Sequence, residues 1–361
     1  MTVRRGVEAD MSEQSLGNRA ESAKSSTPGI EIGKTTAWLA DHVQDLQPPL
    51  QFDLIAGGRS NLTYKVTDVA GRSWALRRPP TGMVLQTAHD MSREWTFISA
   101  LNGTDVPVAT PAAYCADHEV TGADFYVMDF TEGKVLGDPA SADGLTDEVK
   151  VQIAHSTVQT MINMHNIDPD AVGLTALRRP GNYIERQLRR WNRQLHDSAI
   201  TDFTVLDEVH RRLSADVPDA PSKIAHGDFR PGNLAYDPAG NAVAVFDWEL
   251  ATIGDPLADL SWLLTSWVLP TDDFPGVTDG PTLAGGFPPR EQLADQYAAG
   301  TGADLSRLAY YMAFSRWRAA CIGAGVYSRY IAGVMGEIPK NIDERQTHVH
   351  ELAAAALAGL S

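Results

Sequence analysis

The chain has 361 residues, of which 43% are hydrophobic, so it is long enough for about two domains with sizeable cores. Its formal net charge of −16 argues against non-specific binding to nucleic acid or to an anionic membrane surface. Two cysteines, Cys115 and Cys321, are too few for a disulfide framework and indicate a reducing compartment. We find no apolar run long enough to span a membrane and no signal peptide, so we expect a cytoplasmic protein.

The first part of the chain changes from a polar segment to alternating apolar segments. Residues 1–28 are polar and lack periodicity, which predicts a disordered N-terminal segment. A helix is predicted over residues 35–46. Residues 52–66 indicate a strand, a glycine loop and a second strand. Small residues in the loop 56–61 would let backbone N–H groups approach phosphate oxygens, although a hairpin turn explains these glycines equally well.

The next elements complete a predicted N-terminal lobe. We expect a strand over residues 73–80, a helix over 89–101, and strands over 107–114 and 124–130. The remainder shows mainly helical periodicity. The predicted helices cover residues 146–165, 182–195, 204–213, 290–299, 304–329 and 351–360. The predicted division is therefore an N-lobe over 29–131 and a larger C-lobe over 132–361.

The most informative stretch lies between residues 222 and 263. Asp228 follows a short apolar segment, and Asn233 follows five residues later. This is the D-x-x-x-x-N spacing of a kinase catalytic loop, where the carboxylate orients the attacking hydroxyl and the amide holds Mg²⁺. Asp247 ends a second apolar segment, at the place of the kinase D-F-G aspartate. One Asp and one Asn suffice because Mg²⁺ takes few protein oxygens and keeps several waters.

These motifs together resemble a known family. His226-Gly227-Asp228 with Asn233, then Asp247-Trp248-Glu249 and Gly254-Asp255-Pro256, resemble the aminoglycoside phosphotransferase family, in particular the branch that includes kinase-like domains fused to some acyl-CoA dehydrogenases. The resemblance covers residues 55–330. It implies a two-lobe, protein-kinase-like α+β fold, with an antiparallel N-lobe sheet and a larger helical C-lobe. The implied activity is ATP- and Mg²⁺-dependent phosphorylation of a hydroxyl on a small molecule.

The resemblance also assigns roles to individual residues. Asp228 becomes the catalytic base, and Asn233 and Asp247 become the metal ligands. The implied nucleotide contacts are Gly58, Ser60, Asn61, Arg77, Glu94, Met128 and Phe130, the last two through the backbone of the interlobe hinge. The candidates for supporting contacts are His226, Arg230 and Glu249. For Glu249, a plain surface charge is the alternative.

Arg77 departs from the kinase pattern, which has a lysine at this position. Arginine keeps the positive charge and offers a bidentate fork, so it could hold phosphate oxygens and pair with Glu94. A solvated strand end for Arg77 and a surface position for Glu94 remain alternatives. Among the other motif residues, Asp255 is predicted to cap the helix that begins at Pro256.

Two other polar residues near these motifs are expected to be structural. Asp259 is interpreted as a structural residue, and His165 as a packed or capping histidine.

The acceptor is the least determined part of the sequence-based function. The resemblance favours a metabolite such as a hydroxyacyl-CoA over an aminoglycoside, although the acidic charge would suit a cationic antibiotic. The arginine-rich helix 182–195 could supply charges for an anionic CoA. A non-catalytic, nucleotide-binding pseudokinase is the rival from another class. No nucleic acid or membrane partner is expected, and the sequence leaves open ATP versus GTP and monomer versus homodimer.

Overall fold

The computed structural model describes residues 27–57, 61–81, 90–273, 280–335 and 338–360. The predicted disordered segment therefore falls almost wholly outside the described residues, and its last residue, Pro28, accepts a hydrogen bond from the Tyr64 hydroxyl. The chain forms two compact units. Unit 1 holds residues 1–89 with 112–127, and unit 2 holds 90–111 with 128–361. The predicted α+β fold class is confirmed.

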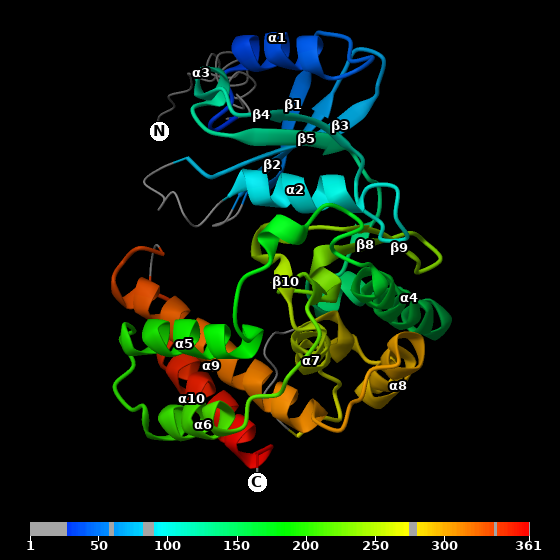
Figure 1. The fold of residues 1–361 in the computed structure, drawn as a ribbon. Helices are drawn as coiled ribbons and strands as arrows, with labels where there is room; N and C mark the ends of the chain where they lie inside the picture. Colours follow the sequence, from blue (N-terminus) through cyan, green and yellow to red (C-terminus); the bar gives the residue numbers. More distant parts are fainter. Residues whose placement is uncertain (1–26, 58–60, 82–89, 274–279, 336–337, 361) are drawn as a thin grey trace, which may run out of the picture. The chain divides into compact units, whose positions relative to one another are not determined.

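Unit 1 is built on a five-stranded sheet in the order β1-β2-β3-β5-β4, with helix α1 over one face (Figure 1). Strands β1, β2 and β3 pair antiparallel, as the sequence predicts. The bounds are α1 Ile32–His42, β1 Gln51–Gly57, β2 Leu62–Thr67, β3 Ser73–Arg78, β4 Pro111–Cys115, α3 His118–Thr121 and β5 Phe125–Asp129.

The two arginines that end β3 face opposite sides of the sheet. Successive side chains of a strand alternate, so Trp74, Leu76 and Arg78 share one face. Trp74 and Leu76 are buried in the core that packs beneath α1, and Arg78 donates hydrogen bonds to the backbone carbonyls of Gly29 and Thr121. Arg78 is therefore structural, whereas Arg77 lies on the face away from this core.

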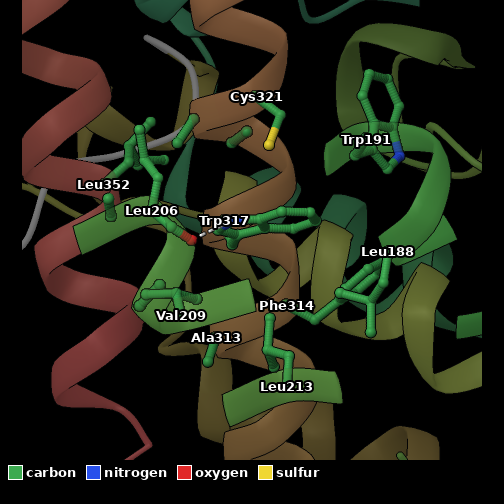
Figure 2. Close-up of a cluster of buried hydrophobic side chains, with 14 of the residues drawn as sticks. Leu188, Trp191, Leu206, Val209, Leu213, Ala313, Phe314, Trp317, Cys321 and Leu352 are labelled. Carbon is green, nitrogen blue, oxygen red and sulfur yellow. Dashed lines mark hydrogen bonds between the residues drawn. The ribbon is translucent and has the colours of Figure 1, made fainter. Parts of the chain in front are cut away.

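Unit 2 is mainly helical, and an extended hydrophobic core surrounds Trp317 of α9. Figure 2 shows Leu188 from α5, Leu206 from α6 and Leu352 from α10 gathered around this ring, whose Nε1 donates to the Leu206 carbonyl at 3.0 Å. The helices are α2 Met91–Leu101, α4 Asp147–Asn166, α5 Tyr183–His196, α6 Thr204–Ala215, α7 Pro256–Ser266, α8 Arg290–Thr301, α9 Leu308–Ile331 and α10 Ile342–Ala358. No helix in the described ranges combines the length and hydropathy that a transmembrane segment needs.

Helix ends follow their capping residues. Thr146 accepts a hydrogen bond from the backbone N–H of Val149, and Asn182 accepts one from Glu185, so α4 and α5 begin one residue after their caps. The last helix differs from prediction. It begins at Ile342, because its polar first half has good helix formers and because Val349 and Leu352 are buried against α9. The first half has no apolar run, so hydrophobic periodicity did not predict it.

Five short strands frame the predicted catalytic segment. Strands β8 (Leu234–Tyr236) and β9 (Ala242–Val245) form a hairpin, and β6 (Lys134–Val135) pairs with β8. The sequence Asp237-Pro238-Ala239-Gly240-Asn241 predicts a turn between β8 and β9, and the backbone hydrogen bond from the Asp237 N–H to the Asn241 carbonyl confirms it. The sequence did not predict that β7 (Lys223–Ala225) pairs with β10 (Thr252–Gly254) and not with β9. This pairing brings the chain before Asp228 back beside the chain after Asp247.

Candidate active site

Asp228 follows β7 after a turn that requires glycine. Gly227 has φ of +86°, and a Cβ there would lie 2.8 Å from the carbonyl oxygen of Leu250. A side chain at this position would be both strained and blocked. The His-Gly-Asp order in the sequence therefore has a backbone cause.

The Asp228 carboxylate is held from two sides and is still partly accessible. Its Oδ1 accepts a hydrogen bond from the Trp262 indole N–H at 2.7 Å, and its Oδ2 accepts one from Asn233 Nδ2 at 2.9 Å. Arg230 Nε lies 3.4 Å from Oδ2, a longer contact from a partly exposed guanidinium. The Asp228 side chain is 22% exposed. It is thus oriented without being sealed from a substrate.

Asn233 is oriented by the same loop. It ends a 3-10 turn, Pro231–Asn233, and its Nδ2 donates to the carbonyl oxygen of Asp228 at 2.8 Å as well as to the carboxylate. These two bonds identify the nitrogen of the side-chain amide, which leaves Oδ1 as its acceptor atom. In the described part of the chain, no hydrogen bond reaches this oxygen. It is therefore the atom that could bind a cation.

His226 connects the catalytic loop to the chain before Asp247. Its Nδ1 accepts a hydrogen bond from the Asp228 backbone N–H at 3.2 Å, so the ring proton belongs on Nε2, which donates to the Phe246 carbonyl at 2.8 Å. The ring is fully buried. His226 therefore holds the loop of Asp228 at a fixed distance from the chain before Asp247, which is a supporting contact of the kind predicted.

Asp247 sits in a backbone conformation that few residues adopt. Its φ of 65° and ψ of 56° are left-handed, a region that Asp tolerates better than most residues. The next residue, Trp248, is fully buried, stacks on Phe97 of α2 and packs against His226. This packing fixes the turn that presents Asp247.

Carboxylates gather beside this turn. Oxygens of Glu94, Asp247 and Glu249 lie within 4.8 Å of one another, and Glu94 comes from the first half of α2. Three negative charges so close favour a bound cation, and oxygen donors suit a hard divalent ion such as Mg²⁺. The donor set therefore fits the metal that the sequence implies.

Two of the three central predicted residues are in contact in unit 2, and the third follows a residue that is bonded to the same loop. Asp228 and Asn233 are in direct contact, and the Phe246 backbone N–H donates to the Asn233 carbonyl at 2.8 Å, one residue before Asp247. The other predicted site residues are divided between the two units. Arg77 and Asn61 belong to unit 1, whereas Met128, Phe130 and Glu94 belong to unit 2, and Gly58 and Ser60 lie outside the described residues. Their roles remain predictions.

Asp259 of α7 binds the backbone of the catalytic loop. It is buried in α7 and accepts hydrogen bonds from the backbone N–H groups of His226 and Gly227 at 2.5 and 2.8 Å. His165 Nε2 lies 3.6 Å from the same carboxylate, and Tyr297 contacts the other ring nitrogen at 2.8 Å. Burial favours a higher pKa for Asp259, but His165, His226 and the Gly227 N–H together outweigh it and lower the pKa. Both Asp259 and His165 are structural, as the sequence predicts.

Asp255, four residues earlier, has the opposite electrostatics. It caps α7 by accepting from the Leu257 backbone N–H at 3.0 Å, which confirms the predicted cap, and it accepts from the Tyr311 hydroxyl at 2.7 Å. Burial raises the pKa of Asp255 to about 6, and the Asp259 charge acts in the same direction. The fold therefore favours the protonated form of Asp255 and the ionised form of Asp259, although both carboxyl groups are buried at the same helix.

Sequence reasoning missed Trp262 and Arg318, which position Asp228. Arg318 of α9 is buried, donates through Nη2 to the Gly227 carbonyl at 2.6 Å, and lies 4.3 Å from the Trp262 ring centroid. Trp262 in turn donates to Asp228. Neither residue carries a local signal, because each lies inside an apolar helical pattern far along the chain from Asp228.

The Trp262 contact predicts a loss of turnover without a loss of nucleotide binding. Trp262→Phe keeps a ring beneath Arg318 but removes the hydrogen bond to a charged oxygen, so kcat should fall roughly 10- to 100-fold. KM for ATP should stay within about twofold. Trp191→Phe is the matched control, because in the described ranges its indole N–H bonds to Gln187 and to no group of the catalytic loop. Equal losses in both variants would contradict the positioning role.

Comparison with known proteins identifies the family. Residues 52–311 match the model of the phosphotransferase enzyme family (APH). The chain belongs to this family. The predicted enzyme class, a small-molecule phosphotransferase with a hydroxyl acceptor, is thereby confirmed at the level of the family.

Individual relatives of this phosphotransferase come from two groups. Mouse acyl-CoA dehydrogenase family member 10 is 33% identical over 290 residues, which cover 79% of this chain and 27% of that protein. The chain thus spans about a quarter of that relative's length. A solved structure from Ralstonia eutropha, provisionally named an aminoglycoside phosphotransferase, is 29% identical with a TM-score of 0.77 and covers 92% of this chain and 98% of that one.

A more distant structure shows the fold alone. Amicoumacin kinase hAmiN, solved in complex with AMP-PNP, Ca²⁺ and Ami, has a TM-score of 0.58 at 16% identity, and the match covers 95% of this chain and 96% of that one. The predicted kinase-like fold is confirmed by both structural matches.

Proposed function

We propose that this phosphotransferase moves the γ-phosphoryl group of ATP, in the presence of Mg²⁺, to a hydroxyl of a small metabolite such as a hydroxyacyl-CoA. The observation that carries the proposal is the joint placement of Asp228, Asn233 and Asp247. Asp228 and Asn233 share a hydrogen bond, and backbone hydrogen bonds of Phe246 tie the residue before Asp247 to the same loop. Kinase chemistry needs a hydroxyl-orienting carboxylate beside amide and carboxylate metal ligands.

Asp228 would receive the acceptor hydroxyl. A carboxylate has about four lone-pair sites, and those not bonded to Trp262 and Asn233 can accept the hydroxyl proton. A carboxylate is a weak base toward an alcohol, so the main contribution of Asp228 is orientation of the attacking oxygen. The rigid contacts of Asp228 suit that task because they fix both carboxylate oxygens before substrate arrives.

The metal would be held by Asn233 Oδ1 and the Asp247 carboxylate, with Glu94 and Glu249 adding negative charge nearby. When bound, Mg²⁺ neutralises charge on the phosphate oxygens. The AMP-PNP and Ca²⁺ in the amicoumacin kinase structure support the use of a nucleotide with a divalent cation in this fold. The predicted contacts at Gly58, Ser60, Asn61, Met128 and Phe130 complete the proposed nucleotide site.

Arg77 is the proposed contact for the nucleotide phosphates. Arg77→Gln should weaken ATP binding about tenfold, because it removes a charged fork from phosphate oxygens. Isothermal titration calorimetry with ATP and Mg²⁺ measures this directly. Arg72→Gln, at an exposed position just before the same strand, should leave ATP affinity unchanged. Unchanged affinity in Arg77→Gln would remove this residue from the nucleotide site.

The proposed acceptor rests on the relatives and is tested by a substrate screen. The match to an acyl-CoA dehydrogenase family member favours an acyl-CoA metabolite, and the Ralstonia structure represents the aminoglycoside alternative. Full-length protein with ATP and Mg²⁺ would be offered hydroxyacyl-CoAs of several chain lengths, aminoglycosides and sugars, with transfer followed by ³¹P NMR. A new phosphate-ester signal with a hydroxyacyl-CoA is expected. Transfer only to aminoglycosides would replace the proposed substrate, and transfer to nothing would favour a pseudokinase.

A further inference from the structure

The segment that leads into α5 brings three arginines together in unit 2: Arg186 Nη1 donates to the Arg179 carbonyl at 3.5 Å and to the Pro180 carbonyl at 3.0 Å, and Arg190 follows one turn later. The charge of Arg93 acts on Arg190, and these four arginines are called the cluster. Arg186 and Arg190 lie one turn apart on α5, Arg179 lies in the turn before α5, and Arg93 lies on α2. The opposite face of α5 is apolar, and Leu188 and Trp191 pack it against α9 (Figure 2). The orientation of α5 is therefore fixed, and it holds the arginine face away from the core.

The charges of the cluster act on one another. Partial loss of water lowers the pKa of Arg93 and of Arg186, and in both cases the charge of Arg179 lowers it further. The pKa of Arg190 is lowered by the same loss of water and then by the charges of Arg318, Arg179 and Arg93. Like charges one turn apart on a helix destabilise it. The cluster thus has an electrostatic cost in the free protein.

No carboxylate offsets this cost among the residues that the structure describes. Other arginines do have acidic partners, for example Arg178 with Asp170 and Arg212 with Glu208. Within the described ranges, no such ion pair forms at Arg93, Arg179, Arg186, Arg190 or Arg318, although Asp90 raises the pKa of Arg93 from a distance. A chain with a net charge of −16 has many carboxylates to spare, so this local excess of positive charge marks a place for an external anion.

The cluster is connected to the catalytic loop. Arg93 donates to the carbonyl of Ala251 at 3.1 Å, just after the Asp247 to Glu249 turn. Arg318, whose charge acts on Arg190, donates to the carbonyl of Gly227, the residue before Asp228. Arg186 donates to the carbonyls of Pro180 and Gly181 and so holds the turn that carries Arg179. The side chains of Arg179 and Arg190 are exposed and therefore accessible to a ligand.

We propose that Arg93, Arg179, Arg186 and Arg190 form a subsite for phosphate groups carried by the acceptor, a step that rests on the proposed phosphoryl transfer. A single carboxylate can satisfy one guanidinium fork, whereas a phosphate or diphosphate offers enough oxygens and charge for several. The subsite accepts phosphorylated acceptors such as CoA thioesters. It repels polycationic aminoglycosides, which sets this chain apart from an antibiotic kinase.

The test uses full-length protein and measures binding separately from turnover. Coenzyme A and inorganic pyrophosphate would be titrated into wild type and into the double variant Arg179→Gln/Arg190→Gln, in the presence of ADP and Mg²⁺. Both substituted side chains are exposed and make no hydrogen bond in the described ranges, so the fold should persist. Coenzyme A affinity should fall at least tenfold, and ADP affinity should stay within twofold. Arg193→Gln, an exposed arginine of the same helix outside the cluster, should change neither.

Each outcome decides the proposal. It is wrong if wild type binds neither probe, if the double variant binds coenzyme A as well as wild type, or if Arg193→Gln loses as much affinity. Loss of ADP binding in place of coenzyme A binding would assign the cluster to the nucleotide. If coenzyme A binding depends on the cluster but no phosphoryl transfer is found, the proposed function fails and the subsite stands. If the protein does transfer phosphate to a hydroxyacyl-CoA but the double variant keeps the wild-type KM for it, the proposed function stands and the subsite fails.

Discussion

Asp228→Asn is expected to lower kcat roughly 10²- to 10⁴-fold, because it removes the group that orients and deprotonates the acceptor hydroxyl. Each Asp228 oxygen already accepts a hydrogen bond, one from Trp262 and one from Asn233. The amide nitrogen of an asparagine must therefore face one of these donors, which disturbs the orientation as well as the charge. ADP affinity should remain within about twofold, since no nucleotide contact is assigned to Asp228.

The measurement is a coupled assay of ADP formation with the acceptor found by the ³¹P screen. Asp219→Asn makes the same chemical change at an exposed position shortly before the motif, where the side chain has no partner in the described ranges, and should leave kcat unchanged. Melting temperatures separate a loss of chemistry from a loss of fold. A folded Asp228→Asn protein with more than a tenth of wild-type turnover would contradict the assigned role.

Asp259→Asn is expected to lower the free energy of unfolding at pH 7 by about 3 kcal/mol, since hydrogen bonds to a charged group contribute about 1.5–3 kcal/mol each. An asparagine can accept from only one of the two backbone N–H groups that Asp259 now binds, and its own amide would face the other. It would also leave His165 beside a neutral partner. Urea unfolding followed by circular dichroism gives the difference.

Asp255→Asn is the contrasting control on the same helix. The Oδ1 of an asparagine can still cap α7, and its Nδ2 can donate to the Tyr311 hydroxyl, which accepts as well as donates. The substitution also removes a carboxylate whose ionisation the fold disfavours. Its unfolding free energy at pH 7 should match or exceed that of wild type. A cost similar to that of Asp259→Asn would show that any change in this helix is damaging, and the specific role of Asp259 would be lost.

The two carboxylates also predict opposite dependence on pH. The pKa of Asp259 is lowered in the folded state, so its stabilisation is present above about pH 4 and is lost as the pH falls through the folded pKa. The gap between wild type and Asp259→Asn should therefore narrow in acid. The pKa of Asp255 is raised from 3.8 to about 6, so the folded state loses stability as the pH rises between these values. Asp255→Asn should remove that loss.

The sequence predicted those parts of the site that depend on local spacing. Asp228 and Asn233 lie on one short loop, and a five-residue offset is enough to place their side chains in contact. Gly227 and Gly240 mark turns because a left-handed backbone favours glycine, and Thr146 and Asn182 mark helix starts because their side chains cap free N–H groups. Asp247 was identified because it ends an apolar segment.

The parts that sequence reasoning missed depend on contacts between distant segments. Trp262 reaches Asp228 across 34 positions, and Arg318 reaches Gly227 across 91. Nothing in the neighbouring residues of either distinguishes it from an ordinary core position. The pairing of β7 with β10 was missed for the same reason, since three-residue strands carry little pattern and their partner is set by tertiary packing.

The left-handed backbone at Asp247 restricts which residues can replace it during evolution. A β-branched or bulky side chain there would add conformational strain to the loss of the carboxylate, whereas asparagine or glycine would fit the backbone. A lineage that abandons catalysis can therefore change this position to asparagine or glycine without unfolding the loop. Inactive descendants of this chain should therefore have asparagine or glycine in place of Asp247, and should retain Gly227 and Trp248.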